Sequence, residues 1–418
     1  EDVLGKTMIN KDGGFFEEGG TSLMSIKLCA ILGERLGVDI SVGQLYKIST
    51  VEEIVKYAYG KRSIGTEVEQ RYYKTEKEWT YPLYGIASCN QVGLYVEWMM
   101  DKRSDRYNFC TALKVPKIFR GNLLIDAMKE MQRRHESLRT RFIEGDRTVL
   151  QVVEAKMNVD VRWRMVKSEM EGRDEGQKFM KEAFDLESEI LMRLQVVQWG
   201  NEQVLITVIQ HIIYDRGCEG VVMGGLLEVY EKLASGEVLD EWKNQSGTMR
   251  EYASWEAKYL KEKQEQLSKF WKTSMMGVQP LKIPKMGVVN ETADTKVKII
   301  KVSLQKINIL RKLMRKERVQ MLAVAQACLG SVLCEISGND SVVLFMALSQ
   351  RGNPRFFKTF GYLMNTIPLH FKLKGKNLIE KIKHCQKKTE ESMIMGTYPF
   401  QWIVKEVIDF GMKISLDN

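Results

Sequence analysis

The chain has 418 residues, 44% of them hydrophobic and 28% charged, a composition typical of a folded globular protein of about two or three domains. Its 63 Lys and Arg residues against 54 Asp and Glu give a net charge of +9, which is modest at this length and predicts no nucleic-acid partner. The longest uncharged stretch, residues 79–96, holds a proline and two glycines, so it does not fit the about 20 apolar residues of a membrane span.

The cysteines and histidines argue against a disulfide framework and against a zinc site. The seven cysteines form no CxxC pair and are odd in number, and the four histidines are scattered without a zinc-binding spacing. Such usage is typical of reduced thiols, so we expect a cytoplasmic protein without a metal site. The first residues show no signal-peptide pattern, and the start of the chain reads as truncated.

The composition changes along the chain in three zones. Residues 1–62 hold short helical patterns separated by glycines, and residues 63–80 are polar and read as a linker. From residue 81 onward helical and strand patterns alternate, which predicts a mixed α/β body. That body is larger than one hydrophobic core usually supports, so we expect two lobes, residues 81–260 and 261–418.

Several segments of the body show clear periodicity. The spacing predicts a helix over 122–131, and the run at 204–209 is rich in β-branched residues, as expected of a strand buried on both faces. Basic residues at 311–318 interleave with apolar ones at helical spacing, which predicts a helix with a solvated basic face. Two further strands are predicted at 296–304 and 342–348, and a charged amphipathic helix at 377–392.

Ser22 stands where an apolar helical pattern begins, directly after a loop with the pair Gly19-Gly20. A serine at this position can accept a backbone N–H bond as a helix cap, which is a purely structural role. The same position also places a hydroxyl beside the positive end of the helix dipole, where a phosphate is favourable.

The string around Ser22 resembles the phosphopantetheine attachment motif of peptidyl carrier proteins. Residues 15–23, Phe-Phe-Glu-Glu-Gly-Gly-Thr-Ser-Leu, carry the Phe-Phe, Gly-Gly and Ser-Leu elements at the spacing of that motif. The resemblance implies a small all-α four-helix carrier bundle over residues 1–62, with most of its first helix missing. It also implies that Ser22 carries 4'-phosphopantetheine as a phosphodiester, attached by a phosphopantetheinyl transferase.

A second candidate site follows the strand predicted at 204–209. His211 stands at the exit of that strand, and Asp215 follows four residues later. A His at the end of a central strand can project into a cleft, and a carboxylate near it can orient the imidazole as a general base. The alternative is a structural Asp beside a partly buried neutral His, and the spacing alone favours that alternative.

An ordered series of motifs resembles the condensation domains of nonribosomal peptide synthetases. Residues 210–216, Gln-His-Ile-Ile-Tyr-Asp-Arg, resemble the family's His-His-x-x-x-Asp-Gly signature, and residues 134–142 match its Arg-His-Glu-x-Leu-Arg-Thr-x-Phe string. The resemblance implies a two-lobed α/β fold of the chloramphenicol-acetyltransferase type, with a tunnel between the lobes and its C-terminal end missing here. The other matching elements, in the family's order, are residues 88–95, 107–108, 184–186, 252–255, 361–369 and 398–400.

The resemblance also implies a reaction and its partners. An acceptor amine attacks a donor aminoacyl or peptidyl thioester, so the chain is an amide-bond-forming acyltransferase of secondary-metabolite biosynthesis. His211 positions or deprotonates the amine, Asp215 holds structure through an ion pair with Arg351, and Asn365 lines the site where the lobes meet. An upstream adenylation domain and a downstream acceptor carrier domain are implied as partners, without nucleic acid or membrane. The other three histidines, His135, His370 and His384, read as structural.

Three positions near this site depart from relatives. Gln210 replaces the family's first His, Arg216 replaces the Gly after the Asp, and Cys218 stands where many relatives have Ser. We expect Arg216, at a tight position, to narrow the tunnel or to add charge near the thioester. We expect Cys218 to be a small packing residue whose thiol is worth testing for reactivity. Two alternatives to condensation follow: a catalytically degenerate recruitment domain, and an epimerisation domain, which the string at 134–142 disfavours.

Overall fold

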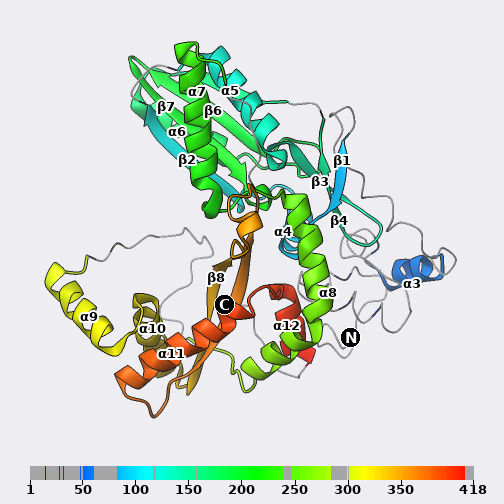
Figure 1. Cartoon of the computed structure of the whole chain (residues 1–418). Helices are drawn as coiled ribbons and strands as arrows, with labels where there is room; N and C mark the ends of the chain where they lie inside the picture. The colour runs from blue at the N-terminus through cyan, green and yellow to red at the C-terminus, as the bar shows by residue number, and fades with distance from the viewer. Residues whose placement is uncertain are drawn as a thin grey trace. The chain divides into compact units, whose positions relative to one another are not determined.

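The computed structural model describes residues 50–60, 82–115, 119–155, 158–239, 246–283, 299 and 301–409, together with the single residues 15, 28, 32 and 48 (Figure 1). Ser22 and the predicted linker 63–80 lie outside the described residues. Helix α3 (Val51–Gly60) is described near the end of the predicted carrier segment. The four-helix carrier bundle therefore stays a prediction.

The chain divides into two compact units. The first unit is Glu1–Glu262 with Ser349–Met364, and the second unit is Lys263–Leu348 with Asn365–Asn418. The sequence pattern predicts a lobe boundary after residue 260 and places every later residue in the second lobe. The structure differs in one segment, residues 349–364, whose buried polar contacts lie within the first unit.

The first unit is built on a four-stranded sheet in the order β2-β7-β6-β5. Its strands are β2 (Asn108–Val115), β5 (Asp160–Met165), β6 (Met192–Trp199) and β7 (Glu202–Gln210). Strand β7 pairs antiparallel with β2 and β6, and β5 pairs parallel with β6. Because β7 is central and its residues from Leu205 onward are all buried, the strand predicted at 204–209 is confirmed.

Three helices pack against this sheet: α5 (Gly121–Arg134), α6 (Glu169–Met180) and α7 (Gly225–Ser235). Helices α5 and α7 lie side by side (Figure 1), with Met131 against Gly225. Helix α6 lies so close to β7 that a Cβ added at Gly176 would be only 2.7 Å from the Ile206 side chain. The helix predicted over 122–131 is confirmed as the central part of α5.

A three-stranded antiparallel sheet, in the order β1-β4-β3, also belongs to the first unit. Its strands are β1 (Leu83–Ile86), β3 (Thr140–Glu144) and β4 (Val149–Val153). Helix α4 (Cys89–Met100) follows β1 and begins with a capping box, in which Ser88 and Gln91 each accept the other's backbone N–H. The long helix α8 (Met249–Ser274) starts in the first unit and continues into the second.

The second unit contains the paired strands β8 (Ser341–Ser349) and β9 (Met364–Lys372), except for the residues Ser349 and Met364, which belong to the first unit. Its other helices are α9 (Leu304–Glu317), α10 (Met321–Ser337), α11 (Leu378–Ile394) and α12 (Phe400–Asp409). Strand β8 confirms the strand predicted at 342–348, and α11 confirms the helix predicted at 377–392.

The strand predicted at 296–304 is wrong where the structure describes it. Residues 301–303 belong to no strand, and Leu304 is the first residue of α9. The reason is a helix cap: the Ser303 side chain accepts a hydrogen bond from Lys306 N. Residues 301–303 therefore lead into helix α9 and do not form a strand.

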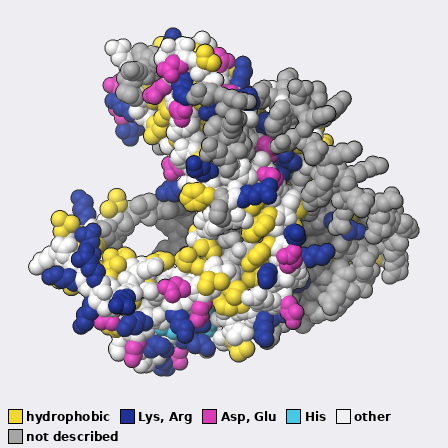
Figure 2. Space-filling view, in the orientation of Figure 1, with side chains coloured by type: hydrophobic (Ala, Val, Ile, Leu, Met, Phe, Trp, Pro, Cys, Tyr) yellow, Lys and Arg dark blue, Asp and Glu magenta, His cyan; other side chains and the backbone are white. Residues whose placement is uncertain are grey.

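Helix α9 carries its basic side chains on the surface, and Figure 2 shows Lys and Arg gathered over it. None of its residues is buried, and Leu304 is 78% exposed, which confirms the solvated helix predicted near 311–318. No single helix in the described ranges is long and apolar enough to cross a membrane. Helices α9 and α10 meet the length and composition criteria only together, as a pair bent by 106°.

Candidate functional site

His211 is the first residue after β7 and begins a short 3-10 turn, η2 (His211–Ile213). Its backbone N–H donates to Tyr107 O at 2.8 Å, and its ring Nδ1 lies 2.5 Å from Tyr214 O. A carbonyl oxygen can only accept, so this contact assigns a proton to Nδ1, and in the neutral form of the ring the lone pair is then on Nε2. The side chain is only partly buried, and no hydrogen-bond partner to Nε2 occurs among the described residues.

Two aromatic rings flank the imidazole of His211. The ring centroids of Phe109 and Tyr362 lie 5.2 Å and 4.8 Å from it, and both contacts are edge-on. Such contacts restrict how far the imidazole can rotate about its side-chain bonds. Together with the Nδ1 contact, they give His211 one orientation within the first unit.

Asp215 is 1% exposed, and three groups bond its carboxylate. Oδ1 accepts from Arg351 Nη2 at 2.9 Å and from Gly217 N at 2.8 Å, and Oδ2 accepts from Leu363 N at 2.8 Å. The ion pair expected with Arg351 is therefore present. The other interpretation, in which Asp215 orients the imidazole, is wrong, because the Tyr214 carbonyl occupies that place. A backbone group of this kind leaves no residue-type signal in a sequence.

Arg351 fixes residues 349–364 onto the turn that follows β7. Besides Asp215, its guanidinium donates to Thr359 O and to Gly361 O. Its two terminal nitrogens are thus bonded to three oxygens, and Nε has no hydrogen-bond partner among the described residues. Such bonds help to offset the unfavourable burial of the charge. The segment therefore belongs with the first unit although it follows most of the second unit in the chain.

Gly217 is the tight position of this turn, and Arg216 is not. A Cβ at Gly217 would lie 2.5 Å from Arg351 Nε and 2.9 Å from Asp215 Oδ1, so only glycine fits without moving the ion pair. The Arg216 side chain is exposed, with its guanidinium 5.9 Å from the Phe109 ring centroid. The expectation that Arg216 occupies a tight position is thus corrected, while a charge from Arg216 near the thioester stays a prediction.

Gln210 takes the place of the family's first His at the end of β7. It is 5% exposed, and its Oε1 accepts from Ile212 N at 2.6 Å, capping the turn η2. Gln210 is also one of the residues that line a hollow of about 360 Å³. The other residues that line this hollow are Glu97, Trp98, Met100, Asp101, Ser104, Arg106 and Tyr107.

Cys218 is fully buried, and its Sγ donates to Asp215 O at 3.0 Å. Burial is the main cause that raises the pKa of this thiol, to about 11. The side chain is therefore packed in the core of the first unit, and because a buried thiol of raised pKa is a poor nucleophile, we expect low reactivity.

In native protein at pH 8 we expect iodoacetamide to label Cys218 at least about 100-fold more slowly than the exposed Cys328, because little thiolate is present and access is blocked. Peptide mass spectrometry over a labelling time course measures both rates in one sample. Equal rates for the two cysteines would contradict a packing role, and labelling after denaturation in urea serves as the control for both.

Asn365 lies at the start of β9 and makes all its described side-chain bonds inside the second unit. Nδ2 donates to Gly396 O at 2.8 Å and to Tyr398 O at 2.7 Å, while Oδ1 accepts from Phe400 N at 3.2 Å. These bonds hold the loop between α11 and α12 against β9. Asn365 therefore has a structural role within the second unit.

The remaining histidines have structural contacts, as the sequence predicts. Burial lowers the pKa of His135 to about 4, and its ring lies 5.4 Å from the Phe360 ring centroid. His370 Nδ1 lies 3.2 Å from Ser274 O, and His384 Nε2 accepts from Lys372 N at 3.4 Å. None of these three rings carries the contact pattern of His211.

Glu256 is a buried carboxyl that no sequence pattern identifies. It lies on α8, is 2% exposed, and accepts from Cys89 N at 2.7 Å and from Tyr252 Oη at 3.3 Å. Burial is the main cause that raises its pKa to about 7. Glu256 thus holds the first residue of α4, and folding favours its protonated form relative to an ordinary glutamate.

The stability of the first unit should therefore depend on pH through Glu256. Its folded pKa is about 7 against an ordinary value of 4.5, so its contribution is fully present below pH 4.5 and is lost as pH rises to about 7. We expect the free energy of unfolding to fall by about 3 kcal/mol over this window. Glu256→Gln should remove the fall and be more stable than wild type at pH 8.

Urea denaturation of wild type and Glu256→Gln at pH 5 and pH 8 measures this effect. Glu262→Gln, on the exposed face of the same helix, is the matched control and should follow wild type at both pH values. A Glu256→Gln variant with the same pH dependence as wild type would contradict the assignment.

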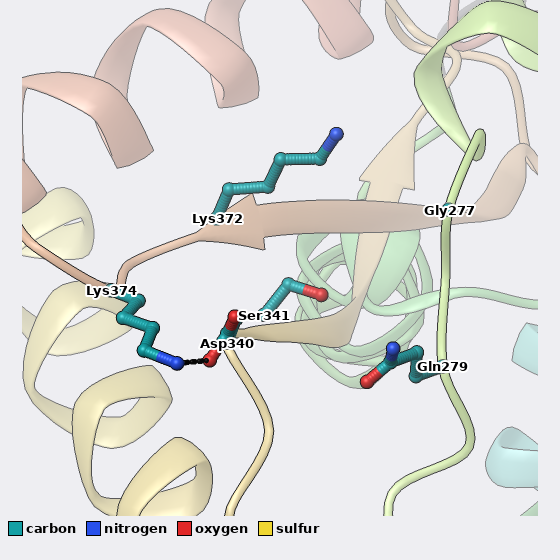
Figure 3. A pocket seen from close by; sticks show the side chains of 6 residues that line it. All are labelled: Gly277, Gln279, Asp340, Ser341, Lys372 and Lys374. Atoms are coloured by element: carbon teal, nitrogen blue, oxygen red, sulfur yellow. Dashed lines mark ion pairs between the residues drawn. The ribbon is translucent and has the colours of Figure 1, made fainter.

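The second unit has its own hollow of about 390 Å³, shown in Figure 3. Lys374 faces Asp340 there at 2.6 Å, and Lys372 extends away from that pair. The other lining residues are Gly277, Gln279 and Ser341, so its lining holds no histidine or cysteine. Across the ranges that the structure describes, no three His, Cys, Asp or Glu side chains gather as a metal site.

Two family models match the chain. The model described as a condensation domain matches residues 80–409, and the one described as a phosphopantetheine attachment site matches residues 1–58. This is the order that the motifs at Ser22 and His211 predict. The predicted resemblance to a nonribosomal peptide synthetase fragment, with its phosphopantetheine attachment site, is confirmed.

Curated relatives include two bacterial peptide synthases. Bacitracin synthase 2 of Bacillus licheniformis is 23% identical over 418 residues, which cover 99% of this chain and 16% of that protein. Surfactin synthase subunit 1 of Bacillus subtilis (strain 168) is 24% identical over 416 residues, which cover 97% of this chain and 11% of that protein. The chain thus spans less than a fifth of the length of these relatives.

Two solved structures illustrate the fold of this chain. The first condensation domain of the calcium-dependent antibiotic synthetase, in complex with a substrate analogue, has a TM-score of 0.64 at 15% identity, over 78% of this chain and 77% of that one. The complex of the X-domain and OxyB from teicoplanin biosynthesis gives 0.69 at 17% identity, over 83% and 76%. These likenesses show the condensation-domain fold that the motifs predict.

Proposed function

This chain belongs to the condensation-domain family, and on that basis we propose that it joins an acceptor amine to a thioester-bound acyl group through an amide bond. One observation carries the proposal: Nδ1 of His211 is engaged by the Tyr214 carbonyl, so the neutral form of the ring has its lone pair on Nε2. A neutral imidazole with a defined tautomer and one orientation is what a general base or an amine-positioning group needs.

The proposed step balances without a further reactant. The amine nitrogen forms a bond to the acyl carbon, the carbon–sulfur bond of the thioester breaks, and the thiol leaves with the proton that the amine loses. Nε2 of His211 holds the amine or receives its proton. Such a group contributes about 10²- to 10⁴-fold to the rate.

The attachment site in residues 1–58 supports a tethered donor. We assign the attachment to Ser22; the bound phosphopantetheine supplies a thiol on which an aminoacyl or peptidyl group is held as a thioester. Tethering raises the effective concentration of that donor. An upstream adenylation domain, a downstream acceptor carrier and a phosphopantetheinyl transferase complete the proposed setting, in the cytoplasm.

A single-turnover experiment tests the proposal. Ser22 is loaded with an aminoacyl phosphopantetheine, an acceptor-loaded carrier is added, and dipeptide formation is followed by mass spectrometry. Wild type should yield product, and Ser22→Ala, which cannot be loaded, should yield none. A loaded wild type that forms no dipeptide with any of several acceptors would contradict the proposal.

A second candidate function is recruitment of a partner protein. The departures at Gln210 and Arg216 favour it, and so does the likeness to an X-domain solved in complex with OxyB. The retained His211 and its defined tautomer favour catalysis instead. An epimerisation domain is a weaker alternative, which appearance of a D-configured acyl group without any acceptor would support.

A further inference from the structure

Two buried glutamines hold the turn that carries His211. Gln91, in the first turn of α4, donates from Nε2 to Ile212 O at 3.0 Å. Gln210, the last residue of β7, accepts from Ile212 N through Oε1 at 2.6 Å. The two side chains are 1% and 5% exposed, so little water competes for these bonds.

The backbone groups of His211 and Ile212 are all bonded, and side chains supply two of these four bonds. His211 N donates to Tyr107 O, and His211 O accepts from Tyr214 N, so both groups of His211 have backbone partners. Both groups of Ile212 are bonded by the glutamine amides. Ile212 is 0% exposed, and a buried backbone group that loses its partner is strongly unfavourable.

We propose that Gln91 and Gln210 are positioning residues, which clamp the backbone of Ile212 from both sides and thereby fix the imidazole of His211. The link to the imidazole is short, because His211 Nδ1 contacts Tyr214 O within the same turn. A turn that rearranges to find new partners for Ile212 therefore moves the ring. The inference rests on the function proposed for His211 and assigns two further residues to that site.

Substitutions at the two glutamines can remove the bond to Ile212 and leave the other properties of the side chain largely unchanged. Gln91 Oε1 accepts from Ser88 N within the capping box of α4, while its Nε2 serves Ile212. Gln91→Glu keeps an oxygen for Ser88 and loses the donor to Ile212. Gln210→Leu removes the acceptor for Ile212 N, whereas Gln210→Glu keeps an acceptor at similar size.

A buried glutamine elsewhere in the first unit gives the matched control. Gln132 is 0% exposed, and its Nε2 donates to Leu138 O and Asn158 O. Gln132→Leu therefore removes buried side-chain to backbone bonds without touching Ile212. It separates a general loss of stability from a local effect on the turn.

Two measurements on the full chain test the proposal. Hydrogen–deuterium exchange of peptides that cover residues 211–214 reports the turn directly and needs no activity. Single-turnover dipeptide formation reports the position of His211. Thermal unfolding of each variant shows that it is folded at the assay temperature.

We expect Gln91→Glu and Gln210→Leu to exchange about tenfold faster or more at residues 211–214. They should also lower the single-turnover rate by about 10- to 100-fold, as a small misplacement of a reacting group does. Gln210→Glu should restore both values toward wild type. Gln132→Leu should lower the melting temperature and leave both values near those of wild type.

Three results would overturn the proposal: unchanged exchange at residues 211–214, faster exchange with an unchanged rate, or equal effects in Gln132→Leu. If wild type itself forms no dipeptide, the proposed function fails, and exchange alone then decides on the clamp. Faster exchange in both variants would still support it, and unchanged exchange would overturn it.

Discussion

Replacing His211 with alanine lowers the single-turnover rate of dipeptide formation by about 10²- to 10⁴-fold, while loading of Ser22 stays unchanged. The reason is that Nε2 is the nitrogen left with a lone pair once the Tyr214 carbonyl engages Nδ1. Loading is unchanged because it takes place on the carrier segment. Quantitative mass spectrometry of the loaded carrier and of the dipeptide measures the two steps separately.

His384→Ala is the matched control for this result. That imidazole accepts a backbone bond from Lys372 in the second unit and has no part in the proposed step, so the rate should equal that of wild type. A His211→Ala variant that forms dipeptide at the wild-type rate would contradict catalysis by His211. Unchanged binding of a partner protein by that variant would then support the recruitment function.

Arg351→Met lowers the free energy of unfolding of the first unit by about 3 to 5 kcal/mol. The substitution leaves the carboxylate of Asp215 at 1% exposure without its cation, and a buried unpaired charge is far less stable than the intact pair. Urea denaturation followed by tryptophan fluorescence measures the loss. The double variant Asp215→Asn, Arg351→Met should recover part of it, because the buried charge is then gone.

A surface ion pair of Arg355, four residues after Arg351, serves as the control. Arg355 pairs with Glu251 at 2.5 Å, but the two side chains are 62% and 43% exposed. Such pairs contribute about 1 kcal/mol or less, so Arg355→Met should change the free energy of unfolding little. Equal losses for Arg351→Met and Arg355→Met would contradict the importance of the buried pair.

Hydrophobic periodicity was sufficient to predict the helices and strands that bury one continuous apolar surface. The β-branched run at 204–209 predicts β7, and the apolar spacing at 122–131 predicts α5, because each element buries one continuous apolar surface. The strand prediction at 296–304 was wrong, because Ser303 caps a helix that begins at Leu304. Local alternation does not reveal which residue accepts the first helical N–H.

The candidate site could be predicted only as far as residue types mark it. The motifs identify His211, and they pair Asp215 with Arg351, which the structure contains. They do not reveal the Tyr214 carbonyl on His211 or the amide clamp on Ile212. Those contacts depend on the backbone path after β7, and the place of Gly217 depends on how closely Arg351 approaches. The contacts that Gln91 and Arg351 make with the turn come from segments far apart in the chain.

Asp215 and Arg351 are 136 positions apart in the chain, and this separation also affects how the protein is made. A ribosome adds about 5 to 20 residues per second, so the Asp215 turn waits on the order of 10 seconds before its cation has been synthesised. During that interval the carboxylate stays hydrated, and the turn that carries His211 lacks its closing segment. Any nascent chain that stalls between residues 262 and 349 exposes an incomplete core, a natural substrate for chaperones.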